Sequence, residues 1–338
     1  MWTEEKLNAL LTTPSDKLVE DMKKIKGDIM VLGAGGKMGP TLCTLAANAC
    51  KAAGVDKKVI AVSRFSDPIA TQLLKDNGVE TISCDMLEPK ALDKLPDCEN
   101  VIYMAGRKFG TDGSEYLTWA MNAWLPSLVA ERFKTSNIVV FSSGNIYPFV
   151  PVHSGGCTEQ IKPLPTGEYA MSCLARERMF EYAAKTYGTK IFAYRLNYAV
   201  DLRYGVLYDI AQSVINKTPI SLLNSCYNCI WQGDANEIAI RGLLHADSSY
   251  NIVNVTGPEI ISTRKTAMEF GRLFDIEPIF VGEEENTALL NDSSKMCDLF
   301  GYPTVSVNKL IEWQAEWIKD GGRSLGKPTH FEEKKGKF

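Results

Sequence analysis

The sequence predicts an α/β fold in which helices cover both faces of a doubly wound parallel sheet, with a smaller α/β lobe at the C-terminal end. Three observations support this prediction. Short apolar runs alternate with helical stretches up to about residue 196, a glycine-rich turn directly follows the first run, and the alternation loosens beyond residue 196. Strands that alternate with helices are joined by right-handed crossovers, which makes the strands parallel and places helices on both faces.

The apolar runs before residue 196 are typical of buried parallel strands, which are continuously hydrophobic instead of alternating. We expect such strands at 29–32, 59–62, 79–83, 101–104, 138–141 and 191–194. Helices are expected between them at about 37–53, 67–77, 114–134 and 167–187. Beyond residue 196 we expect helices near 203–216, 234–246, 262–274, 292–300 and 306–319, and short strands near 228–232, 250–254 and 277–281.

Four segments follow from this pattern. Residues 1–26 are predicted to form an amphipathic helical extension that packs on the outside of the main domain, with a helix start signal at 14–16. The main domain spans 27–196. A smaller lobe, interleaved with the last strands of the sheet, spans 197–326. Residues 327–338 are polar and basic, and we expect them to form a surface arm.

Composition argues against several classes of function. The chain has 338 residues and a formal net charge of -4, so nucleic acid and anionic membranes find no electrostatic attraction. No apolar run approaches bilayer length, and the first residues lack the pattern of a secretory signal. The nine cysteines are an odd number, which favours reduced thiols in a cytoplasmic protein. Cys226 and Cys229 form a lone C-x-x-C without the second pair that zinc requires, so we expect no metal.

The glycine-rich turn is the strongest functional motif. It follows the strand that ends at Leu32 and leads into a helix, which is the context that a phosphate cradle requires. Its spacing is G-x-x-G-x-x-G, in which one glycine makes the turn, one admits the pyrophosphate and one lets helix and strand pack closely. The turn therefore predicts a Rossmann-type dinucleotide site at Gly33, Gly35, Gly36, Lys37, Met38 and Gly39.

The residues after the second and third strands bear on the cofactor. A carboxylate after the second strand would bind the ribose of NAD, but this position holds Ser63 and Arg64. Arg64 would attract a 2′-phosphate, which favours NADP over NAD. The alternative is a solvated Arg64, or one that stacks on adenine while NAD is bound. We expect Asp85 to accept a hydrogen bond from the adenine amine, with Met86 beside it.

Several motifs occur in an order that resembles the extended short-chain dehydrogenase/reductase family, the NAD-dependent epimerase/dehydratase group. After the glycine turn come the fourth-strand element 101–106, the helix residue Asn122, the serine motif 140–147 and a helix that opens with Tyr169. Later landmarks are Asp234, 250–255 and 294–295. The resemblance extends from Gly33 to about Ile318, and it implies cofactor contacts from Ala105, Gly106, Arg107, Asn122 and Tyr169.

The chemistry that the resemblance implies is hydride transfer between a nicotinamide ring and a hydroxyl or carbonyl carbon. Tyr169 would act as the acid/base and Ser143 would hold the reacting oxygen. In such proteins a lysine lowers the pKa of the tyrosine, because a neighbouring cation favours the phenolate. The resemblance also implies a homodimer that pairs the helices 114–134 and 167–187 across a two-fold axis.

Cys173 departs from this pattern. The family motif Y-x-x-x-K places a lysine four residues after the tyrosine, where this chain has a neutral thiol. Three interpretations are open. Another cation, Arg176 or Lys108, replaces the lysine. Alternatively, Cys173 works as the acid/base, or the site binds the dinucleotide without the usual chemistry. A shifted catalytic tyrosine, such as Tyr147, is a further alternative.

The substrate side shows a second departure. Sugar-nucleotide members of the family carry an arginine before the position of Asp234 that holds a diphosphate, and here Tyr227 stands near that place. A simple sugar, a sugar acid or another polyol therefore competes with a nucleotide sugar. We expect Asn145, Tyr147, Asn197 and Tyr227 to contact the substrate.

The sequence thus predicts an NAD(P)-dependent oxidoreductase or epimerase that acts on a carbohydrate-like small molecule. The alternative is a non-catalytic dinucleotide-binding protein, either a redox sensor or a scaffold.

Overall fold

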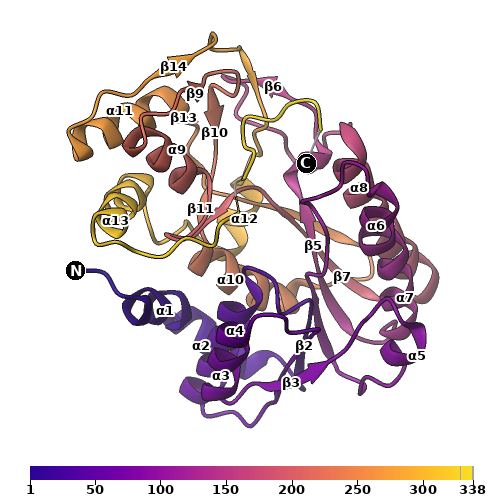
Figure 1. Ribbon diagram of the computed structural model, residues 1–338. Coiled ribbons are helices and arrows are strands. Elements are labelled where there is room, and N and C mark those ends of the chain that lie inside the picture. Colours follow the sequence, from indigo (N-terminus) through magenta and orange to yellow (C-terminus); the bar gives the residue numbers. More distant parts are fainter. Residues whose placement is uncertain (328, 337–338) are drawn as a thin grey trace.

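The structure is a computed structural model that describes residues 1–327 and 329–336. A sheet of seven strands in the order β12-β7-β5-β4-β1-β2-β3 forms its centre, and all neighbouring strands are parallel, which confirms the predicted fold class (Figure 1). The strands are β1 (Ile29–Leu32), β2 (Val59–Ser63), β3 (Glu80–Ser83), β4 (Asn100–Tyr103), β5 (Asn137–Ser143), β7 (Lys190–Leu196) and β12 (Asn251–Val255).

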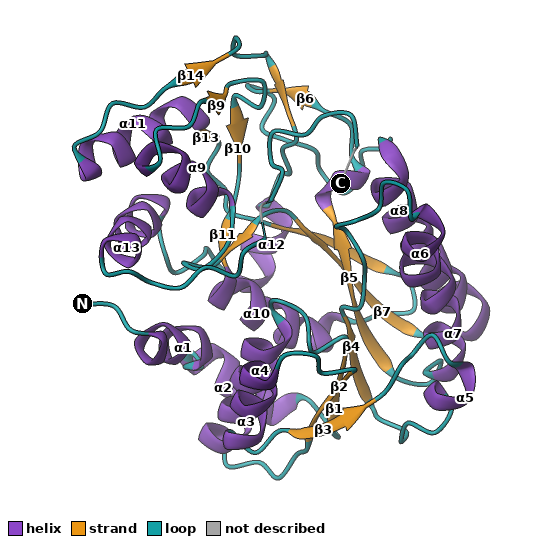
Figure 2. Cartoon of the chain, viewed as in Figure 1, coloured by secondary structure: helices purple, strands orange, loops and turns teal. Residues whose placement is uncertain are grey.

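Apolar clusters lie on both faces of the sheet. Along β1, Ile29 and Val31 point into one cluster, whereas Met30 and Leu32 point into the other, as the two-residue period of a strand requires. Helices cover both clusters, so the sheet is buried on its two faces (Figure 2). The helices on the first face include α3 (Gly39–Ala53) and α10 (Gln232–Arg241), and those on the second include α7 (Leu125–Arg132) and α8 (Gly167–Tyr187).

The order of strands reverses beside β1. The chain runs from β1 outward to β3, then crosses to β4 on the other side of β1. Loops at the carboxyl ends of β1 and β4 therefore diverge, and in open α/β sheets this is the place where ligands bind. The glycine turn occupies this point.

The second lobe is built on α9 (Val206–Ile215), α11 (Thr263–Phe274) and α13 (Val307–Lys319), with four two-stranded sheets at its edges. The remaining helices are α1 (Glu4–Thr12), α2 (Asp16–Lys24), α4 (Pro68–Asp76), α5 (Pro89–Leu92), α6 (Glu115–Trp119), α12 (Ser294–Phe300), and the short η1 (Ala120–Trp124), η2 (Gly144–Ile146) and η3 (Gly242–His245). The short strands pair as β6 (Val150–Pro151) with β15 (Thr287–Ala288), β8 (Ala199–Val200) with β11 (Ile230–Trp231), β9 (Ile220–Ser221) with β14 (Phe280–Val281), and β10 (Cys226–Tyr227) with β13 (Ile261–Ser262).

The N-terminal helices join the two parts of the molecule. Leu7 and Leu11 of α1 are buried in the apolar cluster of the second lobe, whereas Leu18 and Met22 of α2 are buried in the cluster beneath the sheet. Trp2 packs edge-on against Trp313, with their ring centroids 5.5 Å apart. The extension thus bridges the lobes, beyond the outer packing that the sequence predicts.

Three expectations need correction. The helix expected over 114–134 is interrupted by the π-helical η1, next to Pro126, which has no N–H to donate to the preceding turn. The strand expected to be buried at 79–83 lies at the edge of the sheet, where Glu80 and Ser83 are exposed. The surface arm expected at 327–338 instead packs against the body in its described part, because Thr329 and Phe331 are buried.

Of the helices within the described residues, none combines the length and the apolar character needed to cross a membrane.

Candidate active site

The glycine turn has the shape of a cradle for phosphate groups. Gly33 has a φ of +94°, which glycine adopts without strain. A Cβ atom there would lie 2.5 Å from the backbone nitrogen of Ala105, and one at Gly39 would collide with the carbonyl group of Ala34. The turn leads into the N-terminus of α3, where backbone N–H groups and the helix dipole favour an anion. These features fit the pyrophosphate of a dinucleotide.

One cavity of about 310 Å³ extends from the glycine turn to the end of β5 and the start of α8. It joins the predicted cofactor turn with the predicted acid/base. Among the residues expected at the site, those that line it are Gly33, Gly36, Lys37, Met38, Gly106, Lys108, Ser143, Asn145, Tyr169 and Asn197.

Tyr169 and Ser143 lie together in this cavity. Burial raises the pKa of Tyr169, the adjacent Cys173 raises it further, and the Arg176 guanidinium and a hydrogen bond with Ser143 oppose the increase. Ser143 ends β5, and its side chain also caps the short helix η2 by accepting from the Asn145 backbone at 3.2 Å. The pair therefore offers two hydroxyl groups to one substrate oxygen.

Cys173 lies one helical turn behind Tyr169, outside the cavity lining. Its side chain is fully buried in a small apolar cluster with Ile146 and Leu289. Burial raises the pKa of the Cys173 thiol, which keeps it neutral near pH 7. This environment disfavours Cys173 as the working acid/base.

Arg176 holds a positive charge behind the tyrosine. Its guanidinium donates to the Phe141 carbonyl and to the Asn122 amide oxygen, both at 2.7 Å, and its side chain is buried. It lies against Gly106, because a Cβ atom there would be 2.5 Å from the guanidinium nitrogen. Arg176 therefore acts on Tyr169 through its electric field and does not face the cavity.

Lys108 supplies a second cation, inside the cavity. Its Nζ lies 5.8 Å from the centre of the Tyr169 ring and donates to the Thr329 carbonyl at 3.1 Å. Burial lowers the pKa of Lys108 to about 8, although Cys173, Asp209 and Glu332 favour the charged form. The lysine is thus mostly protonated at pH 7.

Lys37 belongs to the glycine turn and reaches across to the second lobe. Its Nζ donates to the Ala199 carbonyl at 2.9 Å and lies 4.0 Å from the centre of the Tyr204 ring. Burial lowers the pKa of Lys37 to about 7, with Asp201 opposing the change. An anionic ligand in the turn would favour its charged form.

The residues expected at the adenosine end lie on the neighbouring strand ends, outside the cavity. Ser63 packs against the turn, since a Cβ atom at Gly35 would lie 2.5 Å from its hydroxyl oxygen. Arg64 is exposed. Asp85 is exposed and caps its own loop by accepting from the Leu87 backbone at 3.1 Å, whereas Met86 is buried.

Asn122 organises the loop after β4. Its amide oxygen accepts from the Arg107 backbone N–H and its amide nitrogen donates to the Arg107 carbonyl, both at 2.8 Å. It also donates to Ser172 at 3.0 Å. Asn122 is fully buried, so it positions this loop and Arg107 without facing the cavity. Ala105 is buried beneath Gly33.

Two residues expected to contact the substrate have hydroxyl groups that are bonded in the interior. The Tyr147 hydroxyl accepts from Arg195 at 2.5 Å and donates to Asn254 at 3.0 Å, and burial raises its pKa to about 12. Those bonds commit the Tyr147 hydroxyl and argue against a shifted catalytic tyrosine. The Tyr227 hydroxyl pairs with Thr266 at 2.9 Å within the second lobe. A strand turns Tyr227 inward, which sequence spacing did not reveal.

The structure also adds residues that the sequence did not indicate. Tyr198, Tyr204 and Thr329 line the cavity opposite the glycine turn. Tyr198 has a φ of +46°, an uncommon conformation for a large side chain, directly after the predicted Asn197. Thr329 comes from the C-terminal segment, whose polar sequence carries no motif.

The cysteines give no sign of a metal site. All nine are free thiols. Within the described residues, no group of three or more His, Cys, Asp or Glu side chains is arranged to hold a metal ion.

Comparisons with known proteins agree with a dinucleotide site. The model of the NAD dependent epimerase/dehydratase family matches residues 29–200. A search of curated protein sequences found no significant match.

Solved structures resemble the chain in fold. UDP-glucuronic acid 4-epimerase from Bacillus cereus in complex with NAD has a TM-score of 0.70 at 18% identity, covering 87% of this chain and 99% of that chain. UDP-glucose 4-epimerase from Thermus thermophilus in complex with NAD has a TM-score of 0.68 at 18% identity, over 86% and 99%. Pal from Bacillus thuringiensis has a TM-score of 0.72 at 15% identity, over 87% and 99%. At these identities the likeness establishes the fold.

Proposed function

This chain belongs to the NAD-dependent epimerase/dehydratase family, and from that premise we propose that it oxidises or epimerises a hydroxyl-bearing carbon of a carbohydrate-like small molecule. The observation that carries the proposal is the single cavity that joins the glycine turn to Tyr169 and Ser143. When bound, the nicotinamide ring supplies the group that accepts or returns a hydride.

The residues of this chain then handle the proton. Tyr169 removes the proton from a substrate hydroxyl or returns it to a carbonyl oxygen, and Ser143 holds the same oxygen by a hydrogen bond. Lys37 and the turn bind the cofactor phosphates. Asn145 and Asn197, which line the cavity beyond Tyr169, orient the substrate.

We propose that two cations divide the work of the missing lysine. Arg176, fixed behind Tyr169, lowers the pKa of the tyrosine by its charge. Lys108, inside the cavity, has the access needed to donate to the cofactor ribose. Charges in a buried site act strongly because little water screens them. The two cations favour an enzyme over a non-catalytic dinucleotide-binding protein, for which an apolar surround would suffice.

The role of Lys108 predicts a pH dependence. Because burial lowers the pKa of Lys108 to about 8, its charge is present at neutral pH and is lost as the pH rises through that value. We expect kcat to fall above about pH 8, approaching about tenfold per pH unit. The measurement is a pH profile of kcat at saturating cofactor.

Lys108→Arg is the matched variant, since its guanidinium stays charged. It is expected to keep activity to higher pH. Lys108→Met should weaken cofactor binding and lower kcat. An identical fall above pH 8 in wild type and Lys108→Arg would show that another group titrates.

The preference for NADP over NAD remains part of the proposal. Arg64 is exposed beyond the end of β2, where a 2′-phosphate would lie. We expect Arg64→Ala to weaken NADP binding by about tenfold to a hundredfold, because a hydrogen bond to a charged group contributes about 1.5–3 kcal/mol, and to leave NAD binding nearly unchanged. Titration calorimetry with both cofactors measures this. Lys75→Ala, an exposed lysine of α4, is the control. Equal losses of affinity for NADP and NAD would show that Arg64 does not bind the 2′-phosphate.

We propose a homodimer that forms through the outer faces of α6 with η1, and of α8. Tyr116 and Trp124 are 72% and 47% exposed, and Met171 and Tyr182 of α8 are 44% and 58% exposed, so both segments present apolar surface. Light scattering of the purified protein tests the assembly, and a monomer at micromolar concentration would contradict it.

A further inference from the structure

The C-terminal segment 329–336 lies across the substrate end of the cavity. The Thr329 backbone and hydroxyl donate to Asp209 of α9 at 2.8 and 2.5 Å, and its carbonyl accepts from Lys108. At the other end, Gly336 packs on Thr166 and Gly167 at the start of α8. The segment therefore connects the second lobe with the loop that carries Lys108 and with the start of the helix that carries Tyr169.

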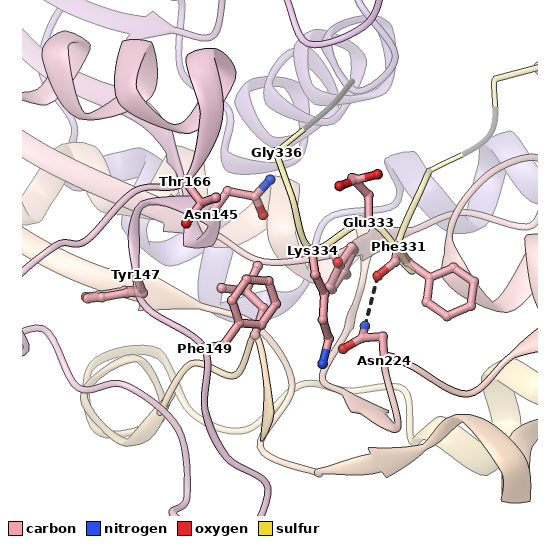
Figure 3. Close-up of a pocket in the computed structure, with 11 residues that line it drawn as sticks. Asn145, Tyr147, Phe149, Thr166, Asn224, Phe331, Glu333, Lys334 and Gly336 are labelled. Carbon is pink, nitrogen blue, oxygen red and sulfur yellow. Dashed lines mark hydrogen bonds between the residues drawn. The ribbon is translucent and has the colours of Figure 1, made fainter. Parts of the chain in front are cut away.

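Its middle part is anchored by an aromatic ring and a lysine. Phe331 is 8% exposed and lies 6.3 Å from the Tyr227 ring, and its carbonyl accepts from the Asn224 amide at 2.9 Å (Figure 3). The Lys334 Nζ donates to Glu285 at 2.7 Å and lies 5.3 Å from the centre of the Phe149 ring. These contacts hold the segment in place, so it is a fixed part of the site.

The space beneath this segment is very small. A second cavity, which shares Asn145 and Tyr198 with the main one, has a volume of only about 20 Å³. Phe331, Glu333 and Lys334 form its outer wall (Figure 3). That volume holds about one water molecule. The Asn224 amide oxygen, on a side chain that is 1% exposed, has no hydrogen-bond partner there among the described residues, so a water or a substrate hydroxyl is expected beside it.

The charges near the wall do not suit a diphosphate. Arg195 pairs with Glu177, Arg203 with Asp201, and Arg241 with Asp21, so each is held by a carboxylate. In the described part of the chain, the charged side chains that line either cavity are Lys37, Lys108, Glu333 and Lys334. Lys37 belongs to the cofactor turn, and Lys108 lies beside Tyr169 and donates to the Thr329 carbonyl. Lys334 is paired with Glu285, and Glu333 would repel a diphosphate.

We propose that residues 329–336 are a built-in wall of the substrate site that excludes nucleotide-diphosphate sugars, and that the substrate is a polyol of monosaccharide size without a nucleotide. This inference rests on the proposed function, because it assumes that the substrate reacts beside Tyr169. A substituent that extends from that position toward the second lobe meets Phe331 and Glu333. The free Asn224 oxygen then accepts a bond from a hydroxyl of the small substrate, directly or through a water.

The test is calorimetric binding of UDP and UDP-glucose to the NAD-loaded protein. The intact chain is expected to show no binding at micromolar concentration. A chain that ends at Gly326 should bind UDP at least about tenfold more tightly than the intact chain, because the steric and charge barriers are gone. Phe331→Ala should act in the same direction and serves where the shortened chain fails to fold. Lys335→Ala, an exposed residue of the same segment, should change nothing.

The outcomes separate the wall from the proposed function. Micromolar binding of UDP-glucose to the intact chain would contradict the proposal that residues 329–336 exclude nucleotide sugars. So would continued exclusion of UDP by a shortened chain that keeps its melting temperature and its NAD affinity. Neither binding readout requires turnover. The test of the wall therefore stays valid even if Tyr169 is not the acid/base. If the protein turned over a nucleotide sugar through Tyr169, the proposed exclusion of nucleotide sugars would be wrong, whereas the proposed function would stand.

Discussion

Tyr169→Phe is expected to lower turnover by about a thousandfold, the middle of the range for a general acid or base. The phenyl ring keeps the packing of Tyr169 against Lys108, while the hydroxyl that exchanges the proton is lost. Cofactor affinity and melting temperature should therefore change little. Steady-state kinetics and calorimetric binding of the cofactor give the two readouts.

Tyr302→Phe is the control for loss of a hydroxyl, because Tyr302 is 76% exposed and does not line the cavity of Tyr169. It should retain full activity. If Tyr169→Phe turned over at a rate close to that of the wild type, the acid/base would be a different group. If it lost cofactor affinity and turnover together, Tyr169 would act mainly in binding.

Glu177→Ala is expected to lower the free energy of unfolding by about 3–5 kcal/mol, the cost of leaving a buried charge without its partner. Glu177 accepts from two nitrogens of Arg195 at 2.9 and 2.7 Å and from Ser142 at 2.5 Å. Both members of the ion pair are almost fully buried. Removal of the carboxylate leaves the Arg195 guanidinium with only the Tyr147 hydroxyl as a side-chain hydrogen-bond partner among the described residues. The site is buried, so water cannot easily replace the carboxylate.

Denaturant titration measures this effect. Glu181→Ala, one turn further on the same helix, breaks an exposed pair with Arg178 and should cost no more than about 1 kcal/mol. A loss below about 1 kcal/mol for Glu177→Ala would show that the surroundings of Arg195 relax or admit water. The prediction bears on function because β5, which carries Ser142, ends at Ser143.

The sequence predicted the parts of the fold that depend on local pattern. The helix over 167–187 matches α8, and the strand before the glycine turn matches β1, because continuous burial and glycine spacing are local signals. The extent of η1 and the exposed edge at β3 could not be predicted, since both depend on which elements become neighbours in the sheet. The seventh strand, β12, was expected as a short strand, and its pairing with β7 is a non-local fact.

The site was predictable to a similar degree. Motif positions brought Tyr169, Ser143 and the glycine turn to one cavity, because the carboxyl ends of parallel strands meet at one edge of the sheet. Lys108 was a candidate on the same ground. Tyr147 could not be placed from spacing, because its partners Arg195 and Asn254 come from distant strands. The C-terminal segment carries no motif, and only tertiary contacts reveal that Thr329 lines the main cavity and Phe331 the small cavity beside it.

The most direct measurement mixes the cofactor-loaded protein with monosaccharide-sized polyols and follows nicotinamide absorbance together with the stereochemistry of the products. We expect that at least one polyol is oxidised or epimerised, and that Lys108→Met slows the conversion strongly while the protein stays folded. A protein that binds the cofactor and a polyol together, yet neither oxidises nor epimerises any bound compound, would contradict the proposed enzyme and favour a dinucleotide sensor.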